Sequence, residues 1–287
     1  MNREDTGRAA RPARQLIDTP MGRIAVSMTG DCTATEPLVF WPSLLMDHTL
    51  WADQVAYFAE RGVPTIAIDP PGHGRSDALT RHFELEECAD VLEAILDEAG
   101  APRAHLVGNS WGAMTSAVFG ATKPERTASL VLITGTAGTA SVYQRWQFEV
   151  MLAVTKAAEG VPSLLNGQLT RIFFAPNIRT RNPAAVQRML AQVAQCDPVS
   201  IGYAARSVVI RRRDRHTLYR GISAPTLVIS GQHDSIFPPR DGMKLANAIP
   251  RSRFVVIPDA AHLLAAEVPD TINTLIDEHL RGAIQHG

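Results

Sequence analysis

The chain has 287 residues, of which 45% are hydrophobic and 20% charged, and its formal net charge is −1. This balance is typical of a globular protein and gives no indication of binding to nucleic acid or to a membrane. We find no apolar run of membrane-helix length and no secretory signal, and the three widely spaced cysteines indicate neither a disulfide framework nor a Cys-x-x-Cys metal site. We therefore expect a cytoplasmic protein without a metal centre, built as one large domain or as one domain with an insertion.

The N-terminal half alternates short apolar runs with helical patterns. Residues 1–14 are polar and predict a flexible tail, whereas the runs at 15–19 and 23–28 flank a Pro-Met-Gly turn and predict a hairpin. Further buried strands are predicted at 37–42, 64–69 and 128–134. Because parallel strands covered by helices are apolar along their whole length, the pattern predicts an α/β fold with a mostly parallel central sheet.

From residue 140 to residue 220 helical periodicity replaces this alternation, which resumes at a strand predicted for 225–230. A helical block inserted between two sheet strands predicts a cap over the edge of the sheet where ligands bind. We therefore expect a core of residues 15–139 and 221–287, with residues 140–220 as the cap.

The predicted cap carries an unusual charge. Between Ser141 and Arg220 there are twelve Arg or Lys residues and four Asp or Glu residues, a net charge of +8. This charge indicates either a solvated basic face or a guanidinium that reaches inward and clamps a carboxylate on the substrate. The second interpretation predicts an anionic substrate.

The pattern Gly-x-Ser-x-Gly at 108–112 lies between a short apolar strand and a helix expected from Ala113 to Lys123. A serine at the tip of such a strand–turn–helix unit is a nucleophile elbow, in which strained backbone exposes the hydroxyl at the end of the sheet. The two glycines allow the strand and the helix to pack closely. Ser110 is therefore the candidate nucleophile, with an ordinary glycine turn as the alternative.

A serine hydroxyl needs a base to remove its proton, and the base needs an orienting acid. His262 follows a predicted strand and so lies at the same sheet edge as Ser110. Asp234 follows another, and the chain order Ser110, Asp234, His262 is the order expected for an elbow of this kind. Asp241 and Asp259 are weaker candidates for the acid.

An oxyanion hole requires two backbone N–H groups. The N–H of Trp111, directly after the nucleophile, is one candidate; the N–H of Ser43, with Leu44 as the alternative, is the other. The bulky residues around this loop predict an apolar, restricted substrate pocket lined by Trp41, Leu44 and Leu45.

Three other chemically capable residues receive structural interpretations. Asp69 and His73 lie at a loop rich in Pro and Gly, and we expect them to hold its turns. Cys88 lies on the apolar side of a predicted helix and is expected to belong to the core.

With these residues in place, the chain resembles the α/β-hydrolase fold enzymes along almost its whole length after the tail. The resemblance rests on Asp69-Pro-Pro-Gly-His-Gly-Arg-Ser-Asp77, Gly108-Asn-Ser-Trp-Gly112, Pro225-Thr-Leu-Val-Ile-Ser-Gly231 with Asp234, and Ala261-His262 followed by Glu267 and Pro269. Within the family it is most similar to small cytoplasmic lactonases and esterases of the 3-oxoadipate enol-lactonase type, on the cap segment from Asp197 to Asp214. One departure is Trp41-Pro42, where many members have His-Gly. Because proline has no N–H and a fixed φ, we expect a differently shaped oxyanion loop.

The resemblance implies a hydrolase of a small carboxylic ester or lactone that needs no metal or organic cofactor. Three other functions stay open: hydrolysis of a carbon–carbon bond in a vinylogous diketone by the same three residues, perhydrolase-type activity, and ligand binding without catalysis. The stretch Gly108-Asn-Ser110 resembles the elbow of the carbon–carbon hydrolases, but these tend to place an aromatic residue after the base, where this chain has Leu263. We expect a small-molecule substrate, with neither nucleic acid nor membrane as partner, and a homodimer as an open alternative to a monomer.

Overall fold

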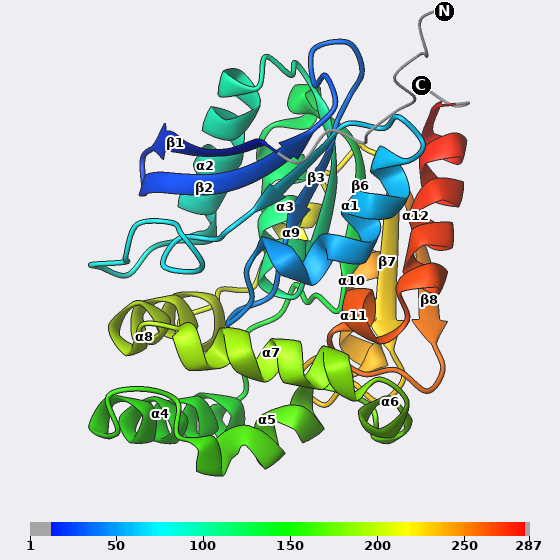
Figure 1. Cartoon of the computed structure of the whole chain (residues 1–287). Helices are drawn as coiled ribbons and strands as arrows, with labels where there is room; N and C mark the ends of the chain where they lie inside the picture. The colour runs from blue at the N-terminus through cyan, green and yellow to red at the C-terminus, as the bar shows by residue number, and fades with distance from the viewer. Residues whose placement is uncertain (1–12, 285–287) are drawn as a thin grey trace, which may run out of the picture.

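The computed structural model describes residues 13–284, which contain a sheet of eight strands in the order β1-β2-β4-β3-β5-β6-β7-β8 (Figure 1). The strands are β1 (Ala13–Thr19), β2 (Gly22–Thr29), β3 (Leu38–Trp41), β4 (Thr65–Ile68), β5 (Ala104–Asn109), β6 (Thr127–Ile133), β7 (Thr226–Gly231) and β8 (Ser252–Ile257). β1 and β2 form the predicted hairpin, β2 also runs antiparallel to β4, and all other neighbours are parallel. The predicted α/β fold is confirmed. Of the predicted tail, residues 1–12 lie outside the described residues, and β1 already begins at Ala13.

Helices of the core cover both faces of the sheet (Figure 1). They are η1 (His48–Trp51), α1 (Ala52–Ala59), α2 (Leu85–Glu98), α3 (Trp111–Thr122), η2 (Pro124–Arg126), α10 (Pro239–Ala248), α11 (Leu264–Glu267) and α12 (Pro269–Ile284). α1 packs beside α12, and α2 beside α3, which also contacts β5 and β6. α3 begins two residues before its predicted start, because Ser110 itself is the N-cap.

The boundaries of α2 follow from its local sequence. Glu84 and Glu87 form a capping box at its start, in which each side chain accepts a hydrogen bond from the other residue's backbone N–H. Its apolar residues, among them Cys88 and Leu92, are buried along one face. Gly100, with a φ of 64°, lets the chain turn away after the last helical residues. Cys88 is thus a core residue, as predicted.

Between β6 and β7 the described chain forms helices and no strand. These are α4 (Val142–Ala157), η3 (Ser163–Leu165), α5 (Asn166–Phe173), α6 (Pro176–Arg181), α7 (Pro183–Gln195), α8 (Pro198–Ala205), the π-helical turn η4 (Arg206–Ile210) and α9 (His216–Tyr219). Figure 1 shows α4, α5, α7 and α8 gathered below the sheet, beyond the arrowheads of the parallel strands. The helical segment therefore lies where the predicted cap is expected, and we call it the cap below.

The parallel strands β3 to β8 end at the edge of the sheet that faces the cap (Figure 1). The segments that follow four of these strands carry Ser43, Ser110, Asp234 and His262. All four residues are buried. Among the described residues, no helix is both long enough and apolar enough to cross a membrane.

Candidate active site

The elbow at Ser110 has the strained backbone that its sequence pattern predicts. Ser110 has φ 56° and ψ −106°, a conformation that non-glycine residues rarely adopt. A Cβ on Gly108 would collide with the backbone of Gly112, and one on Gly112 would collide with the carbonyl oxygen of Trp41. Both glycines are therefore required by close backbone approach, and the turn holds the Ser110 side chain at the N-terminus of α3.

His262 and Asp234 form a buried pair at the ends of β8 and β7. The Nδ1 atom of His262 lies 2.8 Å from Oδ2 of Asp234, and both side chains are at most 1% exposed. The other carboxylate oxygen of Asp234 accepts the backbone N–H groups of Ile236 and Phe237, at 2.8 and 3.0 Å. With the carboxylate fixed in this way, Nδ1 of His262 is the natural donor and Nε2 is left with a free lone pair.

Ser110 and His262 share one cavity of about 320 Å³ with the loop after β3. Ser43, Leu44 and Leu45 all line it, together with residues of the cap. Trp41 was predicted to line the pocket as well, but it is fully buried behind the loop and is not part of the cavity wall. Its ring packs edge-on against Trp111, with ring centroids 5.7 Å apart. Trp41 therefore supports the elbow rather than the pocket.

The hydrogen bonds within the loop after β3 determine which of its N–H groups are free to donate to an oxyanion. The N–H of Leu45 donates to Nε2 of His73 at 3.0 Å, and the N–H of Met46 donates to the carbonyl of Ser43 at 3.1 Å. Within the described chain the N–H groups of Ser43 and Leu44 have no such partner. Both sequence candidates for the second oxyanion donor thus stay available.

His73 holds the loop after β3 in place through its imidazole ring. Because Nε2 accepts the Leu45 N–H, Nδ1 carries the proton and donates to the carbonyl oxygen of Pro71, at 3.0 Å. Complete burial lowers the pKa of His73 to about 4, so the ring is neutral at pH 7. Leu45 itself has a φ of 71°, a conformation that needs such support. His73 therefore holds the turn of its own loop, as predicted, and the loop after β3 in addition.

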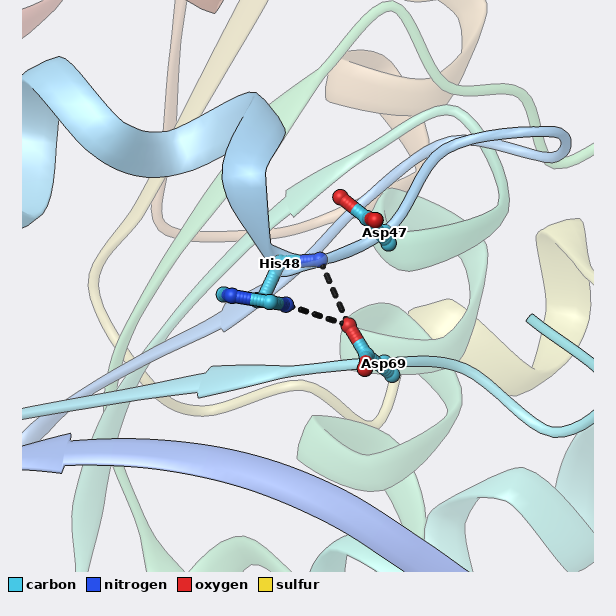
Figure 2. Close-up of side chains that lie close together, drawn as sticks. All are labelled: Asp47, His48 and Asp69. Atoms are coloured by element: carbon cyan, nitrogen blue, oxygen red, sulfur yellow. Dashed lines mark hydrogen bonds and ion pairs between the residues drawn. The ribbon is translucent and has the colours of Figure 1, made fainter. Parts of the chain in front are cut away.

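Asp47, His48 and Asp69 bring three potential ligand atoms within 4.8 Å of one another and so could hold a metal ion. Figure 2 shows that Asp69 is already bonded to His48, through the ring at 2.6 Å and through the backbone N–H at 2.9 Å, while Asp47 bonds to neither. The other Asp69 oxygen accepts the backbone N–H of Arg75. Burial acts to raise the pKa of Asp69, but these hydrogen bonds outweigh it and hold that pKa below its ordinary value. These bonds tie the start of η1 to the end of β4, and they supply both oxygens of Asp69 with protein donors.

Asn109, which the sequence noted only as part of the elbow, and Thr134, which it did not note, hold the main chain of the candidate base. The amide of Asn109 and the hydroxyl of Thr134 both donate to the carbonyl oxygen of His262, at 3.2 and 3.1 Å. Asn109 also donates to Thr134 at 3.0 Å. Asn109 precedes Ser110, and Thr134, with a φ of 48°, directly follows β6. The only indication of this role in the sequence is the polar residue Asn109 directly before Ser110.

Glu267 holds the same loop from the other side. Its carboxylate accepts the N–H of Ala261, next to the base, at 3.0 Å and the N–H of Ala175, in the cap, at 2.9 Å. Burial raises the pKa of Glu267 to about 7, although its backbone donors act in the opposite direction. Glu267 thus links the loop that carries Ala261 and His262 to the cap.

Comparison with known proteins identifies the family. A family model described as the alpha/beta hydrolase fold matches residues 36–268. The 3-oxoadipate enol-lactonase 2 of Acinetobacter baylyi is 28% identical over 240 residues, which cover 84% of this chain and 86% of that protein. A 2-hydroxy-6-oxononadienedioate/2-hydroxy-6-oxononatrienedioate hydrolase of Burkholderia vietnamiensis is 29% identical over 267 residues, covering 90% and 91%.

Among solved structures, a thermophilic esterase from Thermogutta terrifontis matches with a TM-score of 0.84 and 26% identity, covering 94% of this chain and 99% of that one. The family match spans most of the chain and includes the elbow and the residues that face it. The chain therefore belongs to the alpha/beta hydrolase fold family, and within it resembles the enol-lactonases.

Proposed function

We propose that this protein is a serine hydrolase that cleaves a small carboxylic ester or lactone, with Ser110 as nucleophile, His262 as base and Asp234 as orienting acid. The observation that carries the proposal is the buried hydrogen bond of 2.8 Å between His262 and Asp234, in a cavity that Ser110 also lines. The names of the enol-lactonase relative and of the structurally similar esterase support the same reaction class.

In the acylation step, Nε2 of His262 removes the proton from Ser110, and Oγ of Ser110 attacks the substrate carbonyl carbon. The N–H of Trp111 and the N–H of Ser43, with Leu44 as the alternative, stabilise the oxyanion, each contributing about 3–4 kcal/mol. The imidazolium of His262 then protonates the leaving alkoxide, which in a lactone stays attached to the acyl group. Water, deprotonated by His262, releases the acid and restores Ser110.

Asp234 supports both steps by holding His262 in the tautomer with the proton on Nδ1 and by stabilising the imidazolium. Its two backbone donors, Ile236 and Phe237, leave one carboxylate oxygen free for the histidine. Exchange of such an acid for its amide lowers turnover about 10⁴-fold in serine hydrolases, because the histidine is then held in the wrong tautomer.

Carbon–carbon bond hydrolysis is the second candidate, because several relatives are named as hydrolases of 2-hydroxy-6-oxononadienedioate and 2-hydroxy-6-oxononatrienedioate, which places them with the carbon–carbon hydrolases. It would use the same three residues. The Asn109 side chain, which suggested this reaction in the sequence, bonds to the His262 carbonyl and is not part of the cavity wall. Identification of the products from an ester and from a vinylogous diketone separates the two reactions.

The test is active-site labelling with a fluorophosphonate, which needs no knowledge of the substrate. We expect rapid labelling of the wild type, none of Ser110→Ala, and labelling slowed at least about 1,000-fold in His262→Ala and Asp234→Asn. Ser235→Ala is the matched control, since Ser235 lines the same cavity without belonging to the elbow. A folded wild type that does not react would refute the proposal and favour a ligand-binding protein.

A further inference from the structure

The cavity next to Ser110 has an apolar wall without charged side chains of the Asp, Glu, Lys or Arg type. Of the 25 residues that line it, 16 are apolar. The others contribute hydroxyls, amides and the imidazole of His262. A ligand in this cavity therefore meets hydrocarbon over most of its surface.

The polar amides of the wall do not lie deep in the cavity. Gln147 and Gln168 are exposed, so they lie at the mouth between α4 and α5. Gln144 is occupied as a capping residue: its amide donates to the carbonyl of Ile236 at 3.1 Å, and its oxygen accepts the N–H of Ser141. The interior wall is made by the buried side chains of Leu152, Leu169, Ile201 and Val208, to which the buried Thr155 adds a single hydroxyl.

The positive charge of the cap is directed away from this wall. Three of its arginines form ion pairs of 2.7–2.9 Å with carboxylates that are not part of the wall: Arg206 with Glu149, Arg213 with Glu84, and Arg215 with Glu86. Glu149 is already counted in the net charge of +8, whereas Glu84 and Glu86 lie at the start of α2, outside residues 141–220, and compensate two of the positive charges. The net charge of the cap does not indicate a cationic pocket.

Arg212 is the cap guanidinium that packs behind the wall. Its Nε donates to the carbonyl of Gly138 at 2.6 Å and its Nη1 to that of Val208 at 3.5 Å, and its Cζ lies 5.0 Å from the ring centroid of Phe237. Burial lowers the pKa of Arg212 to about 10, so it is a cation at pH 7. Phe237 lines the cavity, whereas Arg212 does not.

We propose that the cavity selects neutral substrates, esters or lactones with an apolar chain of about six to eight carbons, and rejects substrates with a second carboxylate. This inference rests on the proposed function, because the chain enters beside Ser110. A volume of about 320 Å³ has room for about ten non-hydrogen atoms at ~30 Å³ each. A carboxylate placed against this wall would lose its hydration without gaining a cation or a set of donors.

A matched pair of substrates tests the charge preference directly: p-nitrophenyl hexanoate, and p-nitrophenyl hydrogen adipate, in which a carboxylate replaces the terminal methyl group. We expect kcat/KM for the hexanoate to exceed that for the adipate at least about 100-fold. Along the series acetate, butyrate, hexanoate, kcat/KM is expected to rise by up to about fourfold for each methylene.

The same preference is measured without turnover by two inactivators, ethyl p-nitrophenyl hexylphosphonate and its 5-carboxypentyl counterpart. We expect the neutral compound to modify Ser110 at least about 100-fold faster. A ratio near one, or faster reaction of the carboxylate, overturns the inference whatever the esters show. Rapid reaction of the neutral phosphonate, with no turnover of any ester, overturns the proposed ester hydrolysis and still supports the charge preference.

The variant Arg212→Met tests the opposite mechanism, in which the Arg212 guanidinium binds a carboxylate of the substrate. If Arg212 anchored a carboxylate, its removal would lower kcat/KM for the adipate and not for the hexanoate, and that result refutes the inference. We expect the two rates to change by the same factor. Arg213→Met is the matched control, because Arg213 is an exposed residue paired with Glu84. Arg212→Gln, which loses the charge but keeps an N–H donor for the Gly138 carbonyl, covers the case in which the Met variant does not fold.

Discussion

His73 predicts a specific dependence of stability on pH. The ring is neutral in the folded protein, because burial lowers its pKa to about 4, whereas in the unfolded chain its pKa is about 6.5. Below pH 6.5 the unfolded chain therefore binds a proton that the folded protein does not. Linkage requires the free energy of unfolding to fall as the pH falls from 6.5 towards 4.

The size of the effect follows from the two pKa values. Between pH 6.5 and pH 5 His73 alone removes about 1.5 kcal/mol of stability. The variant His73→Phe retains a ring next to Trp111, whose centroid lies 5.5 Å from that of His73, but cannot titrate. It also leaves the buried N–H of Leu45 without its acceptor, which costs a further ~1–3 kcal/mol at both pH values. The loosened oxyanion loop is expected to lower kcat about 10-fold.

Urea unfolding at the two pH values separates these contributions. Wild type is expected to lose about 1.5 kcal/mol more than His73→Phe on going from pH 6.5 to pH 5. The control is His233→Gln, since His233 is an exposed histidine, and it should follow the wild type. An identical loss in wild type and His73→Phe would show that His73 is not held neutral, and the assigned hydrogen bonds would be wrong.

Three further variants test the site. Asn109→Ala combined with Thr134→Val removes both side-chain donors to the His262 carbonyl, so steady-state kinetics should show kcat lower by about 10-fold with KM nearly unchanged. Leu169→Trp fills the cavity, so kcat/KM for the hexanoate ester should fall at least about 10-fold and that for the acetate ester less than threefold. Glu267→Gln removes a carboxyl group whose pKa is raised to about 7 in the folded protein. As the pH rises from 4.5 to 7, the unfolded wild-type chain loses the proton of Glu267 while the folded protein still holds it, so the wild type becomes less stable. In urea unfolding, the variant should therefore gain about 2 kcal/mol relative to wild type between pH 5 and pH 7.

Much of the site could be predicted from the sequence because its signals are local. Gly108 is dictated by a contact within one strand–turn–helix unit and Gly112 by the neighbouring strand β3, and Asp234 and His262 each follow an apolar strand. Parallel strands place their carboxyl ends at one edge, so sequence order alone brings these segments together. The structure places Asp234 and His262 in contact, as that reasoning requires.

The supporting contacts could not be predicted in the same way, because they join residues far apart in the chain. The hydrogen bond from Leu45 to His73 depends on how two loops cross, and those from Asn109 and Thr134 depend on the path of the loop that carries His262. No periodicity or spacing encodes these paths. Trp41 illustrates the same limit: a bulky residue at the end of a strand can face the pocket or the elbow, and packing against Trp111 decides which.

The charge of the cap shows why a net charge is a weak guide to a ligand. It sums over all faces of the helices, whereas recognition depends on the one face that lines the cavity. At one end of that face the cap is bonded to the loop that carries His262. The carbonyl of Phe173 accepts the N–H groups of His262 and Leu263, at 3.3 and 3.2 Å, and Glu267 joins Ala175 to the same loop. Cap residues near this attachment should therefore alter kcat when substituted, whereas those of the wall on α4 should alter the choice of substrate.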